Sequence, residues 1–484
     1  MGRNVSLLLI DGTGALLGAL PPFPAPLPWW QEAADVVAGA RERWGVELAL
    51  LRRLTSERPR PPGGGVTYLA QLDAAPAPHV IRTLEPVAPS LAALALSPAS
   101  ERAPWAIPGG PAASVAWARK TLDEIGRGEL TSTVQQRTWN LSAVWRLSSQ
   151  TPTGVVSTAW LKQVPSFFRH EAAVLCWLGR HAPGIAVPLL ASDGSGRSLL
   201  EHVPGSDAYG CPAPERDRFA TALHRAQSAA AGALDELLAL GVPDRRDAAL
   251  VAFIQRALRD HGGDTSGVAG LLATLPERLA AVLACNVPDT LVHGDFHPGN
   301  VRGDGERFAI IDWGDSFVGH PAFDALRLTD GCSPDDAAFL LREWCRRARQ
   351  TWPSSDPERA LALLRPVVPL RHAAQFASWL PQIEATERPY HCFDVAPCLA
   401  DAATAWRASG ADSIPVATSV RRMAPVTSDE VPGGEAPLNL AGSVSLRPGR
   451  GRRARSRRRA LRRASCLRAW RGPLLRVRAL RRPG

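Results

Sequence analysis

The pattern of hydrophobic and polar positions changes character twice along the chain. Over residues 1–85 the apolar positions come in short alternating runs, which predict strands, with one helical stretch between them. A turn-forming segment, 11–14, separates the first two runs and favours a hairpin. The pattern therefore predicts a small α/β domain with strands at 5–10, 15–20, 46–54 and 66–73 and a helix at 29–44. Residues 86–112, rich in Ala, Pro and Ser, are typical of a loosely packed linker.

A second β-rich region is predicted for residues 113–203. After a helix at 113–125, we expect strands at 133–139, 141–147, 155–163, 187–191 and 198–202, with a helix at 167–180. From residue 204 to residue 410 the apolar positions recur with mainly helical spacing. The predicted helices there are 214–240, 245–260, 268–283, 334–351, 357–383 and 395–407.

One hairpin interrupts this helical region and carries most of the candidate chemistry. The stretch 291–315 reads LVHGDFHPGNVRGDGERFAIIDWGD. Asn300 precedes a strand, a Gly/Asp-rich turn and a second strand, and that strand ends at Asp312. The two residues lie symmetrically about Glu306, so we expect the hairpin to bring them together, with Asp295 in the loop before it. Two carboxylates and an amide oxygen suit phosphoryl transfer from a magnesium–nucleotide complex.

The motif H-G-D-x4-N, followed by I-D-W, resembles the aminoglycoside phosphotransferase and choline-kinase-like family. The resemblance implies an α+β, bilobal, protein-kinase-like fold, with a β-rich lobe at 113–203 and a helical lobe at 204–410. It implies Asp295 as the catalytic base and Asn300 and Asp312 as Mg²⁺ ligands. An alternative is that these residues only cap turns around a hairpin.

The order of elements in residues 1–85 resembles a Nudix domain. The carboxylate-rich Nudix motif is missing, because only Glu42 stands near its expected place and Arg43 occupies the position of a metal-binding Glu. The resemblance implies a catalytically inactive domain that serves in binding or packing.

Basic residues are almost all arginine, and the chain contains only two lysines, Lys120 and Lys162. Lys162 ends the third predicted strand of the β-rich lobe, where the family places its phosphate-binding lysine. Glu171 is the only acid between Lys162 and Asp193. We expect an ion pair between Lys162 and Glu171 that holds the ammonium against the nucleotide phosphates. A solvated strand end and a surface helix glutamate are the alternatives.

The family resemblance also points to the nucleotide base. The segment 199–205 is similar to the hinge between lobes, where backbone groups from Glu201 to Val203 would contact adenine, although it also fits an ordinary strand end. The glycine-rich loop of protein kinases is absent from 139–142, which leaves Ser142 or the backbone near Asn140 as candidate phosphate contacts.

Four residues around the hairpin are candidates for support. His293 is expected to anchor the catalytic loop by hydrogen bonds, and Asp324 to fix that loop or a helix start. Asp315 follows the metal carboxylate closely enough for either a structural or a substrate-binding role. His320, where the family often has Asp, is expected to be structural.

The formal net charge of +10 does not describe the predicted folded part. Sixteen arginines and no acid follow Leu446, so the rest of the chain carries about −6. We expect the tail, 411–484, to be disordered alone. Nucleic acid or an anionic surface could bind only through this arginine-rich tail, and the preferred interpretation is a dispensable extension.

The eight cysteines show no C-x-x-C pair, which favours a reducing compartment. No stretch resembles a signal peptide or a membrane span. We therefore expect a cytoplasmic enzyme.

The leading hypothesis is an ATP-dependent small-molecule kinase, with GTP as an alternative donor, that phosphorylates a hydroxyl group. One alternative is a nucleotide-binding pseudokinase or scaffold without turnover, and another is a nucleic-acid-associated protein that acts through its tail. The motif does not define the acceptor: aminoglycosides, sugars, choline-like alcohols, macrolides and amino-acid derivatives all fit.

Overall fold

The amino-terminal domain is built on a four-stranded sheet of order β2-β1-β4-β3. We describe it from a computed structural model that covers residues 2–410; the predicted tail, 411–484, lies outside the described residues. The central strand β1 (Arg3–Ile10) runs parallel to β4 (Gly64–Leu72) and antiparallel to β2 (Leu16–Ala25), and β3 (Leu48–Ser56) completes the sheet. All four predicted strands are confirmed.

Both faces of β1 are buried, which explains its unbroken apolar end LLLI. Leu7 and Leu9 pack in one cluster with Val36 of α1 (Ala34–Trp44), while Leu8 and Ile10 pack in a second cluster with Ala95 of α3 (Pro89–Leu96). A strand covered on both faces has no reason to alternate. A short helix, α2 (Pro78–Thr83), lies between β4 and α3 in the chain.

The segment 86–112 differs from the predicted loose linker. It holds α3 and a 3₁₀ turn, Pro104–Ala106, in which the Trp105 side chain is 1% exposed. The Trp105 indole Nε1 donates to the carbonyl of Trp139, 3.0 Å away. Composition alone predicted flexibility, but the buried Trp105 and the hydrogen bonds that Arg52 donates to the carbonyls of Ala95 and Ala106 hold the segment.

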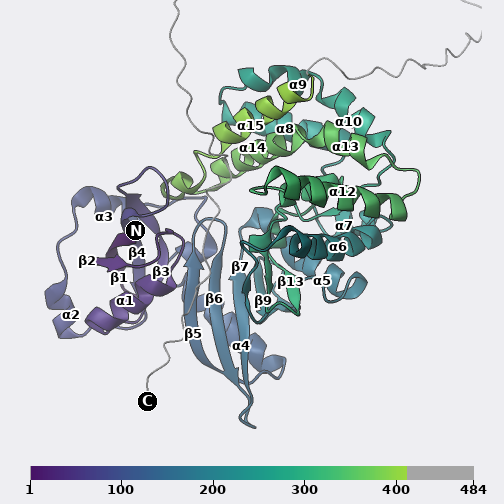
Figure 1. The fold of residues 1–484 in the computed structure, drawn as a ribbon. Coiled ribbons are helices and arrows are strands. Elements are labelled where there is room, and N and C mark those ends of the chain that lie inside the picture. Colours follow the sequence, from purple (N-terminus) through teal and green to yellow (C-terminus); the bar gives the residue numbers. More distant parts are fainter. Residues whose placement is uncertain (1, 411–484) are drawn as a thin grey trace, which may run out of the picture. The chain divides into compact units, whose positions relative to one another are not determined.

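The β-rich lobe is a five-stranded sheet of order β5-β6-β7-β9-β8, preceded in the chain by α4 (Gly110–Glu124). Figure 1 shows β5, β6, β7 and β9 side by side. The helix α5 (Glu171–His181) connects β7 to β8. The strands are β5 (Glu129–Thr138), β6 (Ala143–Gln150), β7 (Val156–Gln163), β8 (Leu189–Ser192) and β9 (Arg197–Glu201).

The remaining described residues form a helical lobe with three small strand pairings. Its helices are α6 (Ala213–Ala230), α7 (Leu234–Ala239), α8 (Asp247–His261), α9 (Ala269–Ala273), α10 (Leu275–Leu283), α11 (Ala322–Leu328), α12 (Pro334–Thr351), α13 (Pro357–Leu364), α14 (Val367–Trp379) and α15 (Val395–Ala408). Its strands are β10 (Ser206–Asp207), β11 (Thr290–Val292), β12 (Val301–Gly303), β13 (Phe308–Ile310) and β14 (Phe317–Gly319). Figure 1 shows α8, α14 and α15 close together, and residues from all three helices share one core cluster.

Three helices predicted as single elements are broken in the structure. The predicted helix 357–383 divides into α13 and α14 at Pro366, which has no N–H to continue the hydrogen-bond ladder. The predicted helix 214–240 divides into α6 and α7 next to Gly232, and 268–283 divides into α9 and α10 just before Pro276. The helical spacing of apolar residues continues through each break, so the pattern alone predicts one helix where the structure has two.

None of the helices in residues 2–410 is by itself long and apolar enough to cross a membrane. One bent pair of helical segments, Ser266–Ala273 and Leu275–Leu283, would reach that length and apolar composition if the two were counted together. Its residues Leu271, Leu275 and Leu279 pack in the core of the helical lobe.

Buried polar contacts join the amino-terminal domain to the two lobes. The side-chain amide of Gln135 on β5 bonds both the N–H and the carbonyl of Leu50, each at 2.8 Å. The carboxylate of Glu387 accepts from the Arg53 N–H at 2.8 Å, and Tyr390 packs in the core cluster of the amino-terminal domain. These contacts fix β3 against the end of the helical lobe.

The Glu387 contact makes stability depend on pH. Burial raises the pKa of Glu387 from 4.5 to about 7, despite the opposing charges of Arg53 and Arg52, and Glu384 adds to the rise. The folded protein keeps this proton after the unfolded chain has lost it, so stability falls as pH rises from about 4.5 to about 7, by up to about 1.4 kcal/mol per pH unit. We expect Glu387→Gln, which retains the oxygen for Arg53, to lose this dependence.

Urea unfolding of both proteins at about pH 5 and about pH 8 measures the effect. The wild-type free energy of unfolding should drop more between the two conditions than that of Glu387→Gln. Parallel changes in the two proteins would contradict the assignment to Glu387.

Candidate active site

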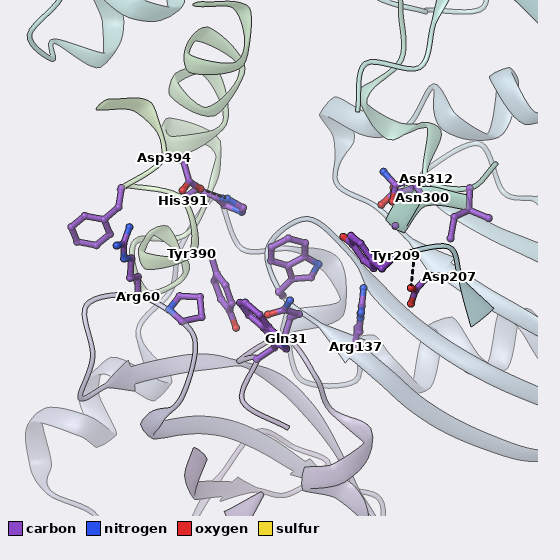
Figure 2. Close-up of a pocket in the computed structure, with 16 residues that line it drawn as sticks. Gln31, Arg60, Arg137, Asp207, Tyr209, Asn300, Asp312, Tyr390, His391 and Asp394 are labelled. Carbon is purple, nitrogen blue, oxygen red and sulfur yellow. Dashed lines mark hydrogen bonds and ion pairs between the residues drawn. The ribbon is translucent and has the colours of Figure 1, made fainter. Parts of the chain in front are cut away.

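The predicted hairpin is present as β12 and β13, with a register one residue different from the expected one. Val301 pairs with Ile310, and the Ile311 N–H donates to the carbonyl of Asn300 at 2.9 Å, so Asn300 faces Ile311. Asp312 then leaves the strand in the left-handed conformation, with φ 64° and ψ 62°. This backbone turn is the reason why Asn300 and Asp312 still line one cavity (Figure 2).

Lys162, Glu171 and Asp312 form a linked set of charges. The Lys162 ammonium lies 2.6 Å from Glu171 Oε1 and 2.7 Å from Asp312 Oδ1. Glu171 Oε1 also accepts from the Trp313 N–H at 3.1 Å, which ties α5 to the segment after Asp312. Burial alone would lower the pKa of Lys162, but the two carboxylates raise it above its ordinary value. The structure thus brings together a predicted phosphate-binding lysine, its predicted partner and a predicted metal ligand.

This geometry suits the lysine at position 162, one of two lysines in an arginine-rich chain. A compact ammonium lies between two carboxylate oxygens here, and a larger planar guanidinium with fixed donors would have to place its charge differently. We expect Lys162→Arg to lower kcat/KM for the nucleotide about 100-fold.

The matched control for that variant is Lys120→Arg, which changes the other lysine. Its side chain is 76% exposed and pairs only with Glu124 in the described structure, so activity should not change. Steady-state kinetics on both variants checks the prediction, and a Lys162→Arg enzyme within threefold of wild type would contradict it.

Asp295 is held by three side chains. Arg327 Nε donates to Asp295 Oδ1 at 2.7 Å, the Asn300 amide donates to the Asp295 carbonyl at 3.0 Å and to Oδ2 at 3.3 Å, and His297 Nε2 lies 3.4 Å from Oδ2. Burial opposes ionisation, but the charge of Arg327 and the contact with His297 hold the pKa of Asp295 well below its usual range. The carboxylate is therefore ionised at working pH and can accept a hydrogen bond from a hydroxyl group.

Arg327 was not predicted from the sequence. It lies on α11 and also donates from Nη1 to Asp330 Oδ2 at 2.7 Å, with its side chain only 7% exposed. A charged residue inside the apolar helix FDALRL was the available signal, because a buried arginine needs a carboxylate partner.

The loop before Asp295 rests on Asp324. The Asp324 carboxylate accepts from the N–H groups of His293 and Gly294, at 2.8 and 2.9 Å, and from the Gln227 amide at 3.0 Å. His293 Nε2 lies 3.0 Å from the Ile311 carbonyl, and its Nδ1 accepts from the Asp295 N–H at 3.3 Å. The contacts of His293 and Asp324 are those of residues that position the catalytic loop.

Asp315 lies apart from the cavity of Asn300 and Asp312. It lines a separate cavity of about 310 Å³ with Phe168 and Arg371, and burial followed by the charge of Asp295 raises the pKa of its carboxyl to about 8. His320 Nδ1 accepts from the Ala322 N–H at 3.2 Å, and burial lowers the pKa of this histidine to about 3. His320 is thus a buried neutral residue with a local backbone contact.

The predicted nucleotide contacts lie at the end of β9 and in the β5–β6 loop. The Glu201 N–H donates to the Pro188 carbonyl at 2.9 Å, its carboxylate pairs with Arg127, and the Val203 carbonyl accepts from Arg302 Nε at 2.8 Å. All these contacts are within the protein and do not test adenine binding, so the role of Glu201 and Val203 there stays a prediction.

In the β5–β6 loop the Ser142 hydroxyl accepts from the Trp139 indole at 3.1 Å, and the Ser142 carbonyl accepts from the Trp139 N–H at the same distance. The loop is therefore closed by its own side chains. Among the described residues Asn140 has no hydrogen-bond partner for its buried amide.

Asn300 and Asp312 suit a magnesium ion bound together with nucleotide phosphates. Mg²⁺ prefers oxygen ligands, keeps several waters and is often held by one or two protein side chains plus phosphate oxygens. An amide oxygen and a carboxylate are such ligands. Within residues 2–410 no cluster of three His, Cys, Asp or Glu side chains is arranged to hold a metal ion.

A model of the phosphotransferase enzyme family, APH, matches residues 124–388, more than half of the chain. The chain belongs to this family. The phosphotransferase has the predicted α+β, bilobal, protein-kinase-like fold, and it is a small-molecule kinase that acts on hydroxyl groups. The family model begins at residue 124, so the likeness of residues 1–85 to a Nudix domain stays a prediction.

Several solved structures are similar to the phosphotransferase. They include macrolide 2'-phosphotransferase MphH from Brachybacterium faecium, with 17% identity, coverage of 60% of this chain and 97% of that chain, and a TM-score of 0.42. A thermostable mutant of aminoglycoside phosphotransferase APH(4)-Ia with ADP and hygromycin B has 16% identity, coverage of 60% and 98%, and a TM-score of 0.39. Plasmodium vivax ethanolamine kinase has 14% identity, coverage of 56% and 79%, and a TM-score of 0.36. The comparison with curated proteins finds no match.

Proposed function

We propose that the phosphotransferase moves the γ-phosphate of ATP to a hydroxyl group of a small molecule, with Mg²⁺ on the phosphates and GTP as a second possible donor. The observation that supports this most is that four candidate residues lie together. Lys162 contacts Asp312, Asn300 contacts Asp295, and Asn300 and Asp312 line the same cavity.

Each residue has a distinct role in this proposal. Lys162, held by Glu171, binds the phosphates, and Asn300 and Asp312 hold Mg²⁺, which neutralises charge on the phosphates when bound. Asp295 orients the attacking hydroxyl and accepts its proton as the transfer proceeds. Catalysis then consists of positioning and charge stabilisation without a covalent intermediate on the protein.

Arg327 extends the set of proposed roles. Its guanidinium fixes Asp295 Oδ1 through Nε and is itself held by Asp330, so the carboxylate keeps one orientation. We assign Arg327 as a positioning residue for Asp295.

A screen for nucleotide consumption tests the function. The full chain is given Mg·ATP or Mg·GTP with one hydroxyl compound at a time: kanamycin, hygromycin B, a macrolide, ethanolamine, choline, and simple sugars. Asp295→Ala serves as the blank. We expect one compound to raise the formation of ADP or GDP above the blank. Nucleotide binding without such a rise for any compound would instead support a protein without turnover.

A further inference from the structure

Half of the residues that line the cavity beside Asn300 and Asp312 lie outside the family match. Of the sixteen residues that line it, eight precede residue 124 or follow residue 388. Figure 2 shows Arg60, His391 and Asp394 on one side of the cavity and Asn300 and Asp312 on the other. The amino-terminal domain thus supplies a wall of the cavity that holds the candidate metal ligands.

Backbone pairing holds this wall in place. The Thr138 N–H donates to the Gln31 carbonyl at 3.0 Å, the Ala33 N–H donates to the Gln136 carbonyl at 2.9 Å, and Arg137 Nε donates to Glu32 Oε1 at 2.8 Å. Residues 31–33 therefore pair alongside β5, which is an edge strand of its sheet and leads into the β5–β6 loop. The side chains of Trp29 and Gln31 are carried to the cavity by this pairing.

The cavity is lined by rings. Trp29, Trp139, Tyr390 and Phe393 contribute aromatic side chains, and the cavity volume is about 120 Å³. A cavity of about 150 Å³ holds benzene, so the space beside Asn300, about 120 Å³, is on the scale of a single ring. Aromatic walls with a few polar groups are typical of small-molecule sites.

One cation of the cavity has no ion pair in the described structure. Among the other charged residues that line it, Asp312 pairs with Lys162, Arg137 pairs with Glu32, and Asp394 lies 3.5 Å from His391. Arg60 lies over the Phe393 ring, 6.0 Å from its centroid, and has no ion pair with any residue in the described part of the chain.

A further donor fits the same kind of ligand. The Tyr390 hydroxyl is buried, and it has no hydrogen-bond partner within residues 2–410. A buried donor without a partner is costly, so a bound oxygen acceptor would stabilise it.

We propose that the amino-terminal domain forms part of the acceptor site and that the acceptor combines a ring with an anionic oxygen group, such as a carboxylate or a phosphate. The ring lies against Trp29 and the other aromatic side chains, and Arg60 binds the anionic group. That the bound ligand is the phosphate acceptor rests on the proposed function. That the cavity binds a ring with an anionic group can be tested separately.

The direct test measures binding of benzoate to the full chain loaded with Mg·ADP, by saturation-transfer NMR, with benzylamine as the cationic counterpart. We expect benzoate to bind, and Arg60→Ala and Trp29→Ala to weaken it about tenfold. Arg82→Ala, which removes another exposed arginine of the same domain on α2, should leave benzoate binding unchanged. Benzylamine binding should not depend on Arg60.

Benzoate that does not bind, or that binds equally to wild type and Arg60→Ala, overturns the inference. Kinetics with the best acceptor of the screen provides a second readout. Arg60→Ala and Gln31→Ala should raise the acceptor KM about tenfold and leave the KM for Mg·ATP within about twofold. An unchanged acceptor KM overturns the inference while leaving the proposed function intact, whereas absent transfer by wild type with intact benzoate binding overturns only the proposed function.

Discussion

Asp295→Ala is expected to lower kcat for phosphate transfer about 10³-fold and to change nucleotide affinity less than about threefold. The Asp295 carboxylate is 14% exposed and is held ionised by Arg327, so its loss removes the one group positioned to take the hydroxyl proton. The nucleotide contacts proposed for Lys162 and Asp312 do not involve Asp295 directly. Steady-state kinetics and calorimetric titration with Mg·ADP separate the two effects.

A matched control for this variant is Asp264→Ala. The Asp264 carboxylate is exposed and bonds the nearby Ser266, far along the chain from the catalytic hairpin, so its removal should leave both kcat and affinity unchanged. Turnover of Asp295→Ala within tenfold of wild type would refute the role of Asp295.

Asp312→Ala is expected to weaken Mg·ADP binding about 100-fold and to abolish the dependence of nucleotide affinity on Mg²⁺. Asp312 is the carboxylate of the proposed metal pair and is 44% exposed in the cavity, so an ion could reach it. Its removal also leaves the Lys162 ammonium with Glu171 as its carboxylate partner. Titrations with ADP, with and without Mg²⁺, measure both effects.

The control for Asp312 lies in the same hairpin. Asp304 occupies its exposed turn and accepts from the Glu306 and Arg307 N–H groups, so Asp304→Ala should perturb only the turn. Mg²⁺-dependent binding that persists in Asp312→Ala would contradict the assignment of the metal ligand.

The hairpin and the Lys162–Glu171 pair could be predicted from sequence because short-range rules determine them. A Gly/Asp turn between two apolar runs forms a hairpin, and a single acid near a single lysine limits the possible partners. The register differs by one residue from the expected one because the turn that closes the hairpin has four residues, 304–307, and is centred between Gly305 and Glu306. The left-handed backbone of Asp312 is a second feature that no strand pattern encodes.

Other parts of the site depend on contacts between residues far apart in the chain. Arg327 contacts Asp295 from the next helix along the chain, and Glu387 bonds Arg53 across 334 positions of the sequence. Pattern and composition cannot pair such residues, since a local signal such as the arginine in the apolar helix FDALRL shows that a partner is needed but not which one. The wall that Trp29 and Arg60 form beside Asn300 was missed for the same reason.

The most direct test of the central claim is transfer of radiolabelled γ-phosphate from Mg·ATP to the best acceptor of the screen. The full chain, Asp295→Ala and Asp264→Ala are compared under single-turnover conditions. The account predicts a labelled acceptor with wild type and Asp264→Ala and almost none with Asp295→Ala. Equal labelling by Asp295→Ala, or bound nucleotide with no labelled acceptor in wild type, would contradict it.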